Sequence, residues 1–257
     1  TTTGARPLFA KLDPAGNLAG CLSGTVLVTS VLATFEGSEP AGLIIAANTP
    51  IANTAWKVFP ALICGNAAVL KAAEDTPATS WLFAKIAHEA GLPQGVLNVI
   101  QGYGTECGAP LVEHPQVDVL SFTGSSKVGK WIGEVRGKTL KKVSLELGGK
   151  NPLIVCDDAD LDEAVKWVSL SAFSNAGQRC AAGSRIIVFD SVYDAFRDKL
   201  VAVAKALKVG PADSDDFGPV INERQLNTML AAVDKATKEG ARVPLVMVTV
   251  TNNTGGG

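Results

Sequence analysis

The chain has 257 residues, with 23 basic and 25 acidic side chains and a net charge of −2. Apolar residues make up 47% and charged residues 19% of it, proportions typical of a globular protein that argue against intrinsic disorder. Since neither charge dominates, we expect no nucleic-acid partner and no charged interaction tail. Five irregularly spaced cysteines and two histidines predict no metal site, and a reducing, cytoplasmic location fits the free thiols.

The stretch from Pro14 to Phe35 carries no charge and is long enough to span a bilayer. Gly, Ser, Thr and Asn interrupt it throughout, and its second half is rich in β-branched residues. We therefore interpret it as a strand or hairpin and expect no membrane contact. An open β-arm of this kind would pair with another subunit, which predicts a homo-oligomer.

From Ala41 onward, short apolar runs alternate with helical patterns. The runs predicted as strands are Ala41–Ala47, Ala67–Lys71, Val96–Ile100, Val117–Phe122 and Lys142–Leu147. Parallel neighbouring strands need crossover helices, so this alternation predicts an α/β fold with a doubly wound, mostly parallel, Rossmann-like sheet.

After Gly148 and Gly149 the pattern restarts. Two more strands are predicted, at Leu153–Cys156 and Arg185–Phe189, and helices are predicted to begin at caps Asp160 and Ser191. A further helix is expected from about residue 222 to 240, with Leu226, Leu230 and Val233 facing inward. Because the double glycine is a candidate boundary, the expected regions are 1–40, 41–148 and 149–257.

Polar residues or glycine follow each of the first five predicted strands, where an open parallel sheet binds its ligands. In chain order these are Asn48, Lys71 with Glu74, Gly102 with Gly104, Thr123-Gly124-Ser125 with Gly129, and Glu146. The glycines would let backbone N–H groups approach a pyrophosphate at a helix N-terminus, although such turns are also common plain connectors. By itself, Lys71 with Glu74 is most simply a solvated ion pair.

Two residues have the right chemistry for catalysis. Glu146 stands between two leucines, so we expect it to be partly buried, and burial would move a carboxylate toward the range useful for a general base. Cys180 lies in a loop of small residues, Asn175–Gly183. A single cysteine is more often a small buried apolar residue than a nucleophile, so both interpretations stay open here. The other cysteines are interpreted as packing residues.

Several motifs, taken together and in order, resemble the aldehyde dehydrogenase superfamily. They are Phe122-Thr-Gly-Ser125, Leu145-Glu-Leu-Gly-Gly-Lys-Asn-Pro152 and Gly177-Gln-Arg-Cys180, with further matches from about Ala41 to Gly240. The resemblance implies a dinucleotide-binding domain at 41–148 and part of a catalytic domain at 149–257, whereas the N-terminal arm or strand region at 1–40 matches the family poorly.

The resemblance also implies a function, the NAD(P)-dependent oxidation of a small-molecule aldehyde to a carboxylic acid. Cys180 would form the thiohemiacetal and thioester, Glu146 would activate water, and Asn48 would donate to the oxyanion. The positions expected to bind the cofactor are Lys71, Glu74, Gly104, Thr123, Gly124, Ser125, Val128, Gly129 and Leu147. NAD is favoured, with NADP as the alternative, and a homodimer or homotetramer is expected.

The chain departs from the family pattern in three places. Ala47 stands where the family often has tryptophan, no proline follows Lys71, and no Glu-x-Phe-Gly-Pro segment occurs. The last departure leads us to expect a fragment of a longer enzyme. One alternative is therefore a catalytically incomplete dinucleotide-binding or assembly fragment. A second is a CoA-acylating relative, which Glu146 disfavours because those enzymes generally lack the water-activating carboxylate.

Overall fold

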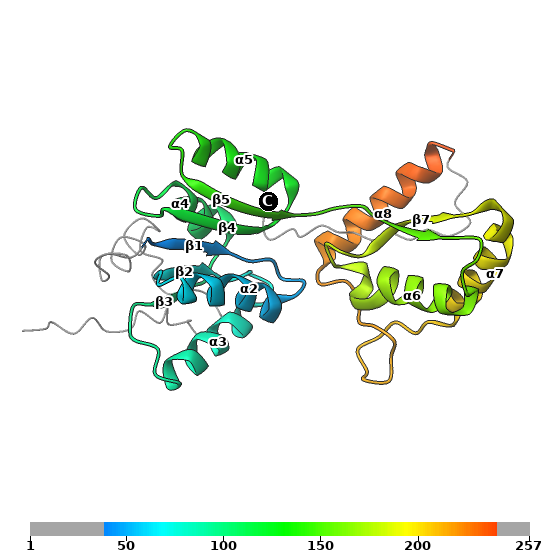
Figure 1. Ribbon diagram of the computed structural model, residues 1–257, viewed down its shortest axis with the longest axis horizontal. Coiled ribbons are helices and arrows are strands. Elements are labelled where there is room, and N and C mark those ends of the chain that lie inside the picture. The colour runs from blue at the N-terminus through cyan, green and yellow to red at the C-terminus, as the bar shows by residue number, and fades with distance from the viewer. Residues whose placement is uncertain (1–38, 241–257) are drawn as a thin grey trace, which may run out of the picture. The chain divides into compact units, whose positions relative to one another are not determined.

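The computed structural model describes residues 39–240 (Figure 1). The expected β-arm at residues 14–35 lies outside this part of the chain. The described residues form two compact units, the first ending at Leu147 and the second beginning at Gly148. Each unit is described by itself.

The first unit is built on a sheet of five parallel strands in the order β3-β2-β1-β4-β5. The strands are β1 (Ala41–Ile44), β2 (Ala68–Lys71), β3 (Leu97–Ile100), β4 (Val119–Gly124) and β5 (Lys142–Leu147). The order reverses between β1 and β4, which is the topological switch point where open α/β sheets bind ligands. The predicted Rossmann-like α/β fold is thus confirmed for this unit.

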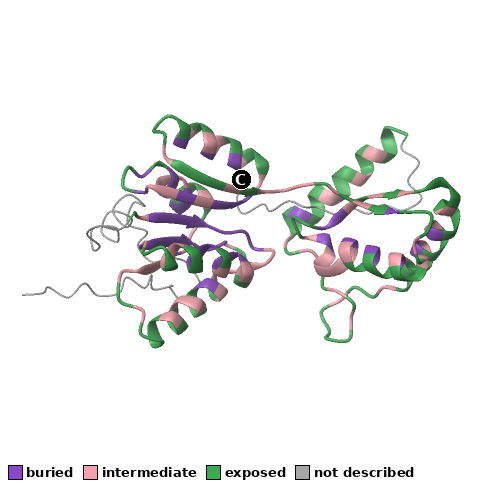
Figure 2. Cartoon of the chain, in the orientation of Figure 1, coloured by how far each residue is buried: buried purple, intermediate pink, exposed green. Residues whose placement is uncertain are grey.

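Helices cover both faces of this sheet (Figure 1). Those on one face are α2 (Pro50–Ile63) and α3 (Pro77–Glu89), and those on the other are α4 (Ala109–Glu113), which follows the π-helical turn η1 (Gly104–Gly108), and α5 (Ser126–Gly137). Along β1, Leu43 packs in the core beneath α2, whereas Ile44 packs in the core beneath α4 and α5. This alternation is the period of two expected of a strand buried on both faces, and the central strands are accordingly purple in Figure 2.

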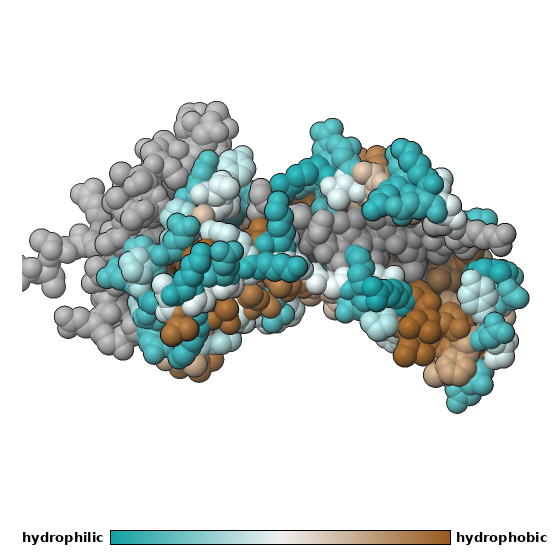
Figure 3. All heavy atoms as spheres, turned by 90° about the horizontal axis from the view of Figure 1, so that it is seen from above, coloured by the Kyte–Doolittle hydropathy of each residue, from teal (hydrophilic) through white to brown (hydrophobic). Residues whose placement is uncertain are grey.

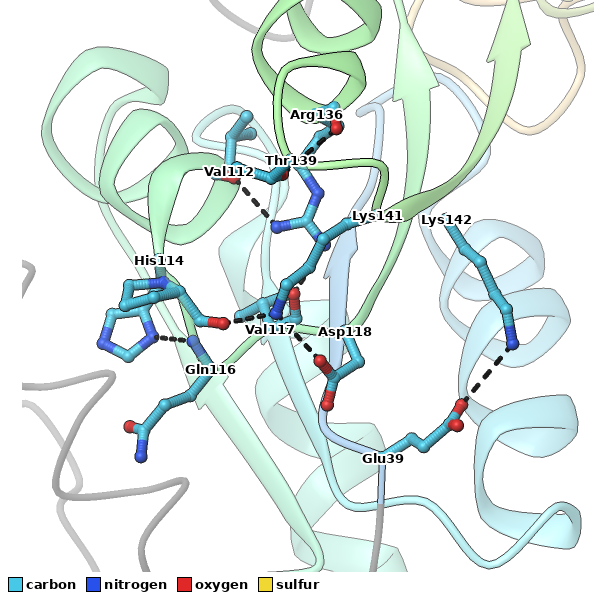
Figure 4. Close-up of polar contacts among 11 residues, drawn as sticks. Glu39, Val112, His114, Gln116, Val117, Asp118, Arg136, Thr139, Lys141 and Lys142 are labelled. Atoms are coloured by element: carbon cyan, nitrogen blue, oxygen red, sulfur yellow. Dashed lines mark hydrogen bonds and ion pairs between the residues drawn. The ribbon is translucent and has the colours of Figure 1, made fainter.

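A buried arginine stabilises the end of the sheet at which β4 begins. The Arg136 guanidinium, 2% exposed, donates to the carbonyl oxygens of Val112 (3.3 Å) and Val117 (2.5 Å) (Figure 4). Burial lowers the pKa of Arg136, and the nearby Asp118 carboxylate partly offsets that effect. Asp118 in turn accepts a hydrogen bond from Lys141 at 2.8 Å. These contacts join the C-terminal end of α5 to α4 and to the segments that lead into β4 and β5, at the end of the sheet opposite the switch point.

The second unit has a parallel pair of strands, β6 (Asn151–Val155) and β7 (Gly183–Val188). Its helical segments are α6 (Leu161–Phe173), the short 3-10 turn η2 (Ser174–Gly177), α7 (Asp190–Ala206) and α8 (Glu223–Lys238). Val155, Val168 and Phe196 are central to its core, which lies between the strands and helices α6 and α7. The predicted cap of α6 is confirmed, because the Asp160 carboxylate accepts hydrogen bonds from the N–H groups of Asp162 and Glu163 in the first turn.

Two expectations for this unit are wrong. Helix α7 begins at Asp190 rather than after a Ser191 cap, because Phe189 occupies the capping position. Helix α8 begins close to the predicted residue 222, with Asn222 as its cap, but Leu226 and Leu230 are 44% and 54% exposed instead of facing inward. Periodicity identifies an apolar face but not whether the fold supplies something to cover it. Apolar side chains are exposed on both units, as the brown surface in Figure 3 shows.

Within residues 39–240, no helix is long and apolar enough to cross a membrane.

Candidate active site

The carboxyl-terminal edge of the five-stranded sheet gathers the polar residues predicted from the first unit. Asn48 follows β1, Lys71 ends β2, and Gly104 lies just beyond β3. In the β4–β5 ladder, Thr123 pairs with Glu146 and Gly124 pairs with Leu147. The predicted site residues therefore lie at or just beyond the carboxyl-terminal ends of the strands of the first unit. Cys180 is the exception, because it belongs to the second unit.

Lys71 and Glu74 form an ion pair that is largely removed from water. Their side chains are 2% and 15% exposed, and Lys71 Nζ lies 2.8 Å from Glu74 Oε2. The interpretation as a solvated pair is wrong because β2 lies between β1 and β3, where its last residue is covered from both sides. A lysine at such a position needs a compensating carboxylate, so Glu74 has a structural reason for its place.

The turn from β4 into α5 has the geometry of an anion-binding site. Ser125 caps α5, with its hydroxyl accepting from the Val128 N–H at 3.3 Å, and the helix N-terminus points its remaining backbone donors outward. Two positions in this turn and helix have no room for a side chain. A Cβ on Gly124 would lie 2.3 Å from the Phe122 ring, and one on Gly129 would lie 2.5 Å from a Leu147 methyl group. The same glycines leave backbone accessible to a ligand at this helix end.

Glu146 is exposed, so the expectation that it is partly buried is wrong within this unit. The cause is the pleat of an edge strand. Leu145 and Leu147 pack toward α5, and alternation turns Glu146 to the opposite face of β5, which has a neighbouring strand on one side only. A solvated carboxylate at this position can still accept a proton from water.

Lys57 is a functional candidate that the sequence reasoning missed. It lies in α2, is 7% exposed, and donates to the Ser121 hydroxyl at 2.8 Å. Burial lowers the pKa of Lys57 to about 8, and the negative charge of Glu146 opposes part of that shift. The signal was present in the sequence, since Lys57 is the only charged residue within the apolar segment Pro50–Ile63.

Cys180 is exposed at the tip of a tight turn in the second unit. The Ala182 N–H donates to the Arg179 carbonyl at 3.1 Å, and Ala182 itself is 1% exposed, so the turn is anchored while the thiol faces solvent. The interpretation of Cys180 as a buried apolar residue is excluded. Cys64 and Cys156 are exposed as well, which makes the packing interpretation wrong for those two, whereas Cys107 is buried.

Comparison with known proteins assigns the chain to a class. Residues 11–254 match the aldehyde dehydrogenase family, so the chain belongs to this family of oxidoreductases, and the predicted resemblance is confirmed. Benzaldehyde dehydrogenase, mitochondrial, of Antirrhinum majus is 47% identical over 206 residues, which are 78% of this chain and 38% of the relative. An aldehyde dehydrogenase of Emericella nidulans is 41% identical over 252 residues, covering 91% of this chain and 50% of the relative.

Solved structures agree with the fold. Betaine aldehyde dehydrogenase of Staphylococcus aureus in complex with NAD+ superposes with a TM-score of 0.76 at 37% identity, over 78% of this chain and 40% of that one. An NADP-dependent enzyme of E. coli gives the same TM-score at 40% identity, over 79% of this chain and 43% of that one. The chain thus spans half or less of the length of these relatives.

Proposed function

We propose that the protein oxidises an aldehyde to a carboxylic acid with NAD as hydride acceptor, using Cys180 as nucleophile and Glu146 as base. The observation that carries the proposal is the exposed thiol of Cys180, held on an anchored turn in a chain of this family. In this proposal each unit has its own role: the first unit would bind the dinucleotide, and the second would supply the nucleophile.

The residues at the sheet edge fit a dinucleotide. Backbone donors at the Ser125-capped start of α5 suit a pyrophosphate, and the Glu74 carboxylate can accept a hydrogen bond from a ribose hydroxyl. Gly104, Thr123, Gly124, Val128, Gly129 and Leu147 complete the proposed cofactor contacts. The chemistry that nicotinamide supplies when bound is hydride acceptance, which converts the Cys180 adduct to a thioester.

The chain's own residues would perform the other steps. The Cys180 thiolate attacks the aldehyde carbon, a C–S bond forms, and the carbonyl oxygen becomes an oxyanion that the Asn48 side-chain N–H stabilises. After oxidation, Glu146 takes a proton from water as the water oxygen attacks the thioester. The C–S bond then breaks, which releases the carboxylic acid and restores the thiolate.

Two substitutions and one control variant test these roles. Cys180→Ala should abolish NADH production and leave NAD binding unchanged, because hydride loss requires the covalent adduct. Cys156→Ala, which removes another exposed thiol of the same unit, should retain full activity. Glu146→Gln should give one burst of NADH followed by little turnover, since only hydrolysis of the thioester is blocked.

The outcomes separate the alternatives. Substantial turnover by Cys180→Ala would remove Cys180 from its role, and loss of the burst in Glu146→Gln would mean that this carboxylate acts before hydride loss. NAD binding by the purified chain without any aldehyde oxidation would support the dinucleotide-binding alternative. CoA-dependent formation of a thioester product would support the acylating one.

Cofactor choice is a separate proposal. We favour NAD over NADP because the Glu74 carboxylate would repel a 2′-phosphate, although Lys71, 2.8 Å away, reduces that repulsion. Glu74→Gln should therefore reduce the preference for NAD, measured as kcat/KM with NAD divided by kcat/KM with NADP. A wild-type preference for NADP would refute the argument.

A cytoplasmic location and a homodimer or homotetramer are also proposed, and light scattering on the purified protein tests the assembly.

A further inference from the structure

We propose that Asn151 is a positioning residue for the nucleophile, holding the main chain of Cys180 in place through its side-chain amide. The inference rests on the proposed role of Cys180, and it concerns only residues of the second unit. Asn151 does not touch a substrate in this scheme. It acts on the turn that presents the thiol.

The geometry of this contact is specific. Asn151 Nδ2 donates to the Cys180 carbonyl oxygen at 2.5 Å and to the Ala182 carbonyl oxygen at 3.3 Å. An amide nitrogen carries two hydrogens, so one side chain can serve both acceptors. The two carbonyls flank Ala181, so this one amide fixes the outgoing half of the Arg179–Ala182 turn.

The strand pairing explains why a side chain is needed there. Asn151 opens β6 and pairs with Gly183, the first residue of β7, and the register then shifts so that Pro152 pairs with Arg185. Proline has no N–H to give to the ladder. The Asn151 amide therefore extends hydrogen bonding beyond the end of the strand pair, to carbonyls in the loop before β7.

A second amide holds the incoming half of the loop. Gln178 Nε2 donates to the Asn175 carbonyl at 3.1 Å, and Gln178 Oε1 accepts from the Ile221 N–H at 2.9 Å, which ties the loop to the segment before α8. This clamp fixes a run of left-handed backbone, with φ of 54° at Asn175, 53° at Ala176 and 69° at Gly177. Alanine rarely adopts such a φ, so surrounding contacts must hold this conformation.

The exposed thiol thus stands on a loop fixed from both sides. Holding the peptide group after Cys180 restricts rotation about its Cα–C bond, which sets where the side chain and neighbouring backbone donors point. A nucleophile that must reach a carbonyl carbon at a defined angle gains rate from such preorganisation. Loosening it should lower the rate of the covalent step more than the affinity for substrate.

Hydrogen exchange and steady-state kinetics on the full chain test the proposal. Asn151→Asp keeps the side chain's shape and removes its donors, and Asn151→Ala removes the contact altogether. In both variants we expect amide exchange in residues 179–183 to accelerate by about tenfold or more, with exchange in α6 and α7 unchanged. We expect kcat to fall by about tenfold or more while KM for the aldehyde stays within about twofold.

Asp160→Ala is the matched control. It removes the cap of α6, another hydrogen-bonding side chain of the same unit, and should loosen the first turn of α6 without changing exchange in residues 179–183 or kcat. If an Asn151 variant does not fold, Asn151→Ser provides the test. Its hydroxyl has a single hydrogen and can serve only one of the two carbonyls, so intermediate effects are expected.

The proposal is overturned if Asn151→Asp shows wild-type exchange in residues 179–183, or if its kcat stays within about twofold of wild type. It is equally overturned if Asp160→Ala lowers kcat as much, because the effect would then be general destabilisation. Turnover by Cys180→Ala would instead refute the proposed function, while the exchange measurement would still decide whether Asn151 holds the loop.

Discussion

Replacing Lys57 with methionine should change how the stability of the first unit depends on pH. Lys57 lies almost fully buried in α2 and reaches the Ser121 hydroxyl, and burial lowers its pKa from 10.5 to about 8. The group is charged at neutral pH in the folded and the unfolded chain. The folded state therefore carries a desolvation penalty at pH 7 that methionine of similar length avoids.

The sign and size of the effect follow from linkage. Between pH 8 and pH 10.5 the unfolded chain binds more protons at this lysine than the folded chain, so the free energy of unfolding rises with pH. The full difference between the lysine pKa of the unfolded and of the folded chain corresponds to a destabilisation of the folded state by roughly 3 kcal/mol. About 1 kcal/mol of it is recovered between pH 7 and pH 9. The wild type should therefore gain stability relative to Lys57→Met as the pH rises through this window.

Urea unfolding at pH 7, 8 and 9 measures the difference. In a Trp167→Phe background the remaining tryptophans lie in the first unit, so fluorescence follows that unit alone. Lys130→Met, which removes an exposed lysine of α5, is the control and should run parallel to wild type. A wild-type-minus-Lys57→Met difference that stays constant from pH 7 to pH 9 would show that burial does not shift this lysine, and the reasoning would be wrong.

Two further predictions concern packing in the same unit. Arg136→Met should lower the free energy of unfolding by about 2–4 kcal/mol, because two buried carbonyls lose their donor, whereas Lys138→Met at the exposed end of α5 should have little effect. Gly129→Ala should destabilise by about 1–3 kcal/mol because the new methyl group meets Leu147, and Gly133→Ala, with open space around it, should stabilise by up to about 1 kcal/mol. Both pairs are measured by urea unfolding, and equal effects within either pair would contradict the packing described.

The sequence determined the architecture of the first unit and the family to which the chain belongs. The alternation of strands and helices predicts a parallel sheet, because parallel neighbouring strands require crossover helices. A strand that is buried on both faces also has a continuous apolar sequence, as these strands do. The ordered motifs around Glu146 and Cys180 were sufficient to place the chain among the aldehyde dehydrogenases. Local signals also predicted caps correctly where one side chain decides the matter, as at Asp160.

Only the tertiary structure decided which side chains are covered. Lys71 and Glu74 look like a solvated pair in sequence, but the fold leaves their side chains only 2% and 15% exposed. Glu146 looks enclosed between leucines, yet an edge strand turns it outward. The Asn151 amide reaches the Cys180 carbonyl across 29 positions of the chain, a contact that no local pattern encodes. Burial and long-range hydrogen bonds depend on what packs against a residue, and this is set by the whole fold rather than by the residue's neighbours in sequence.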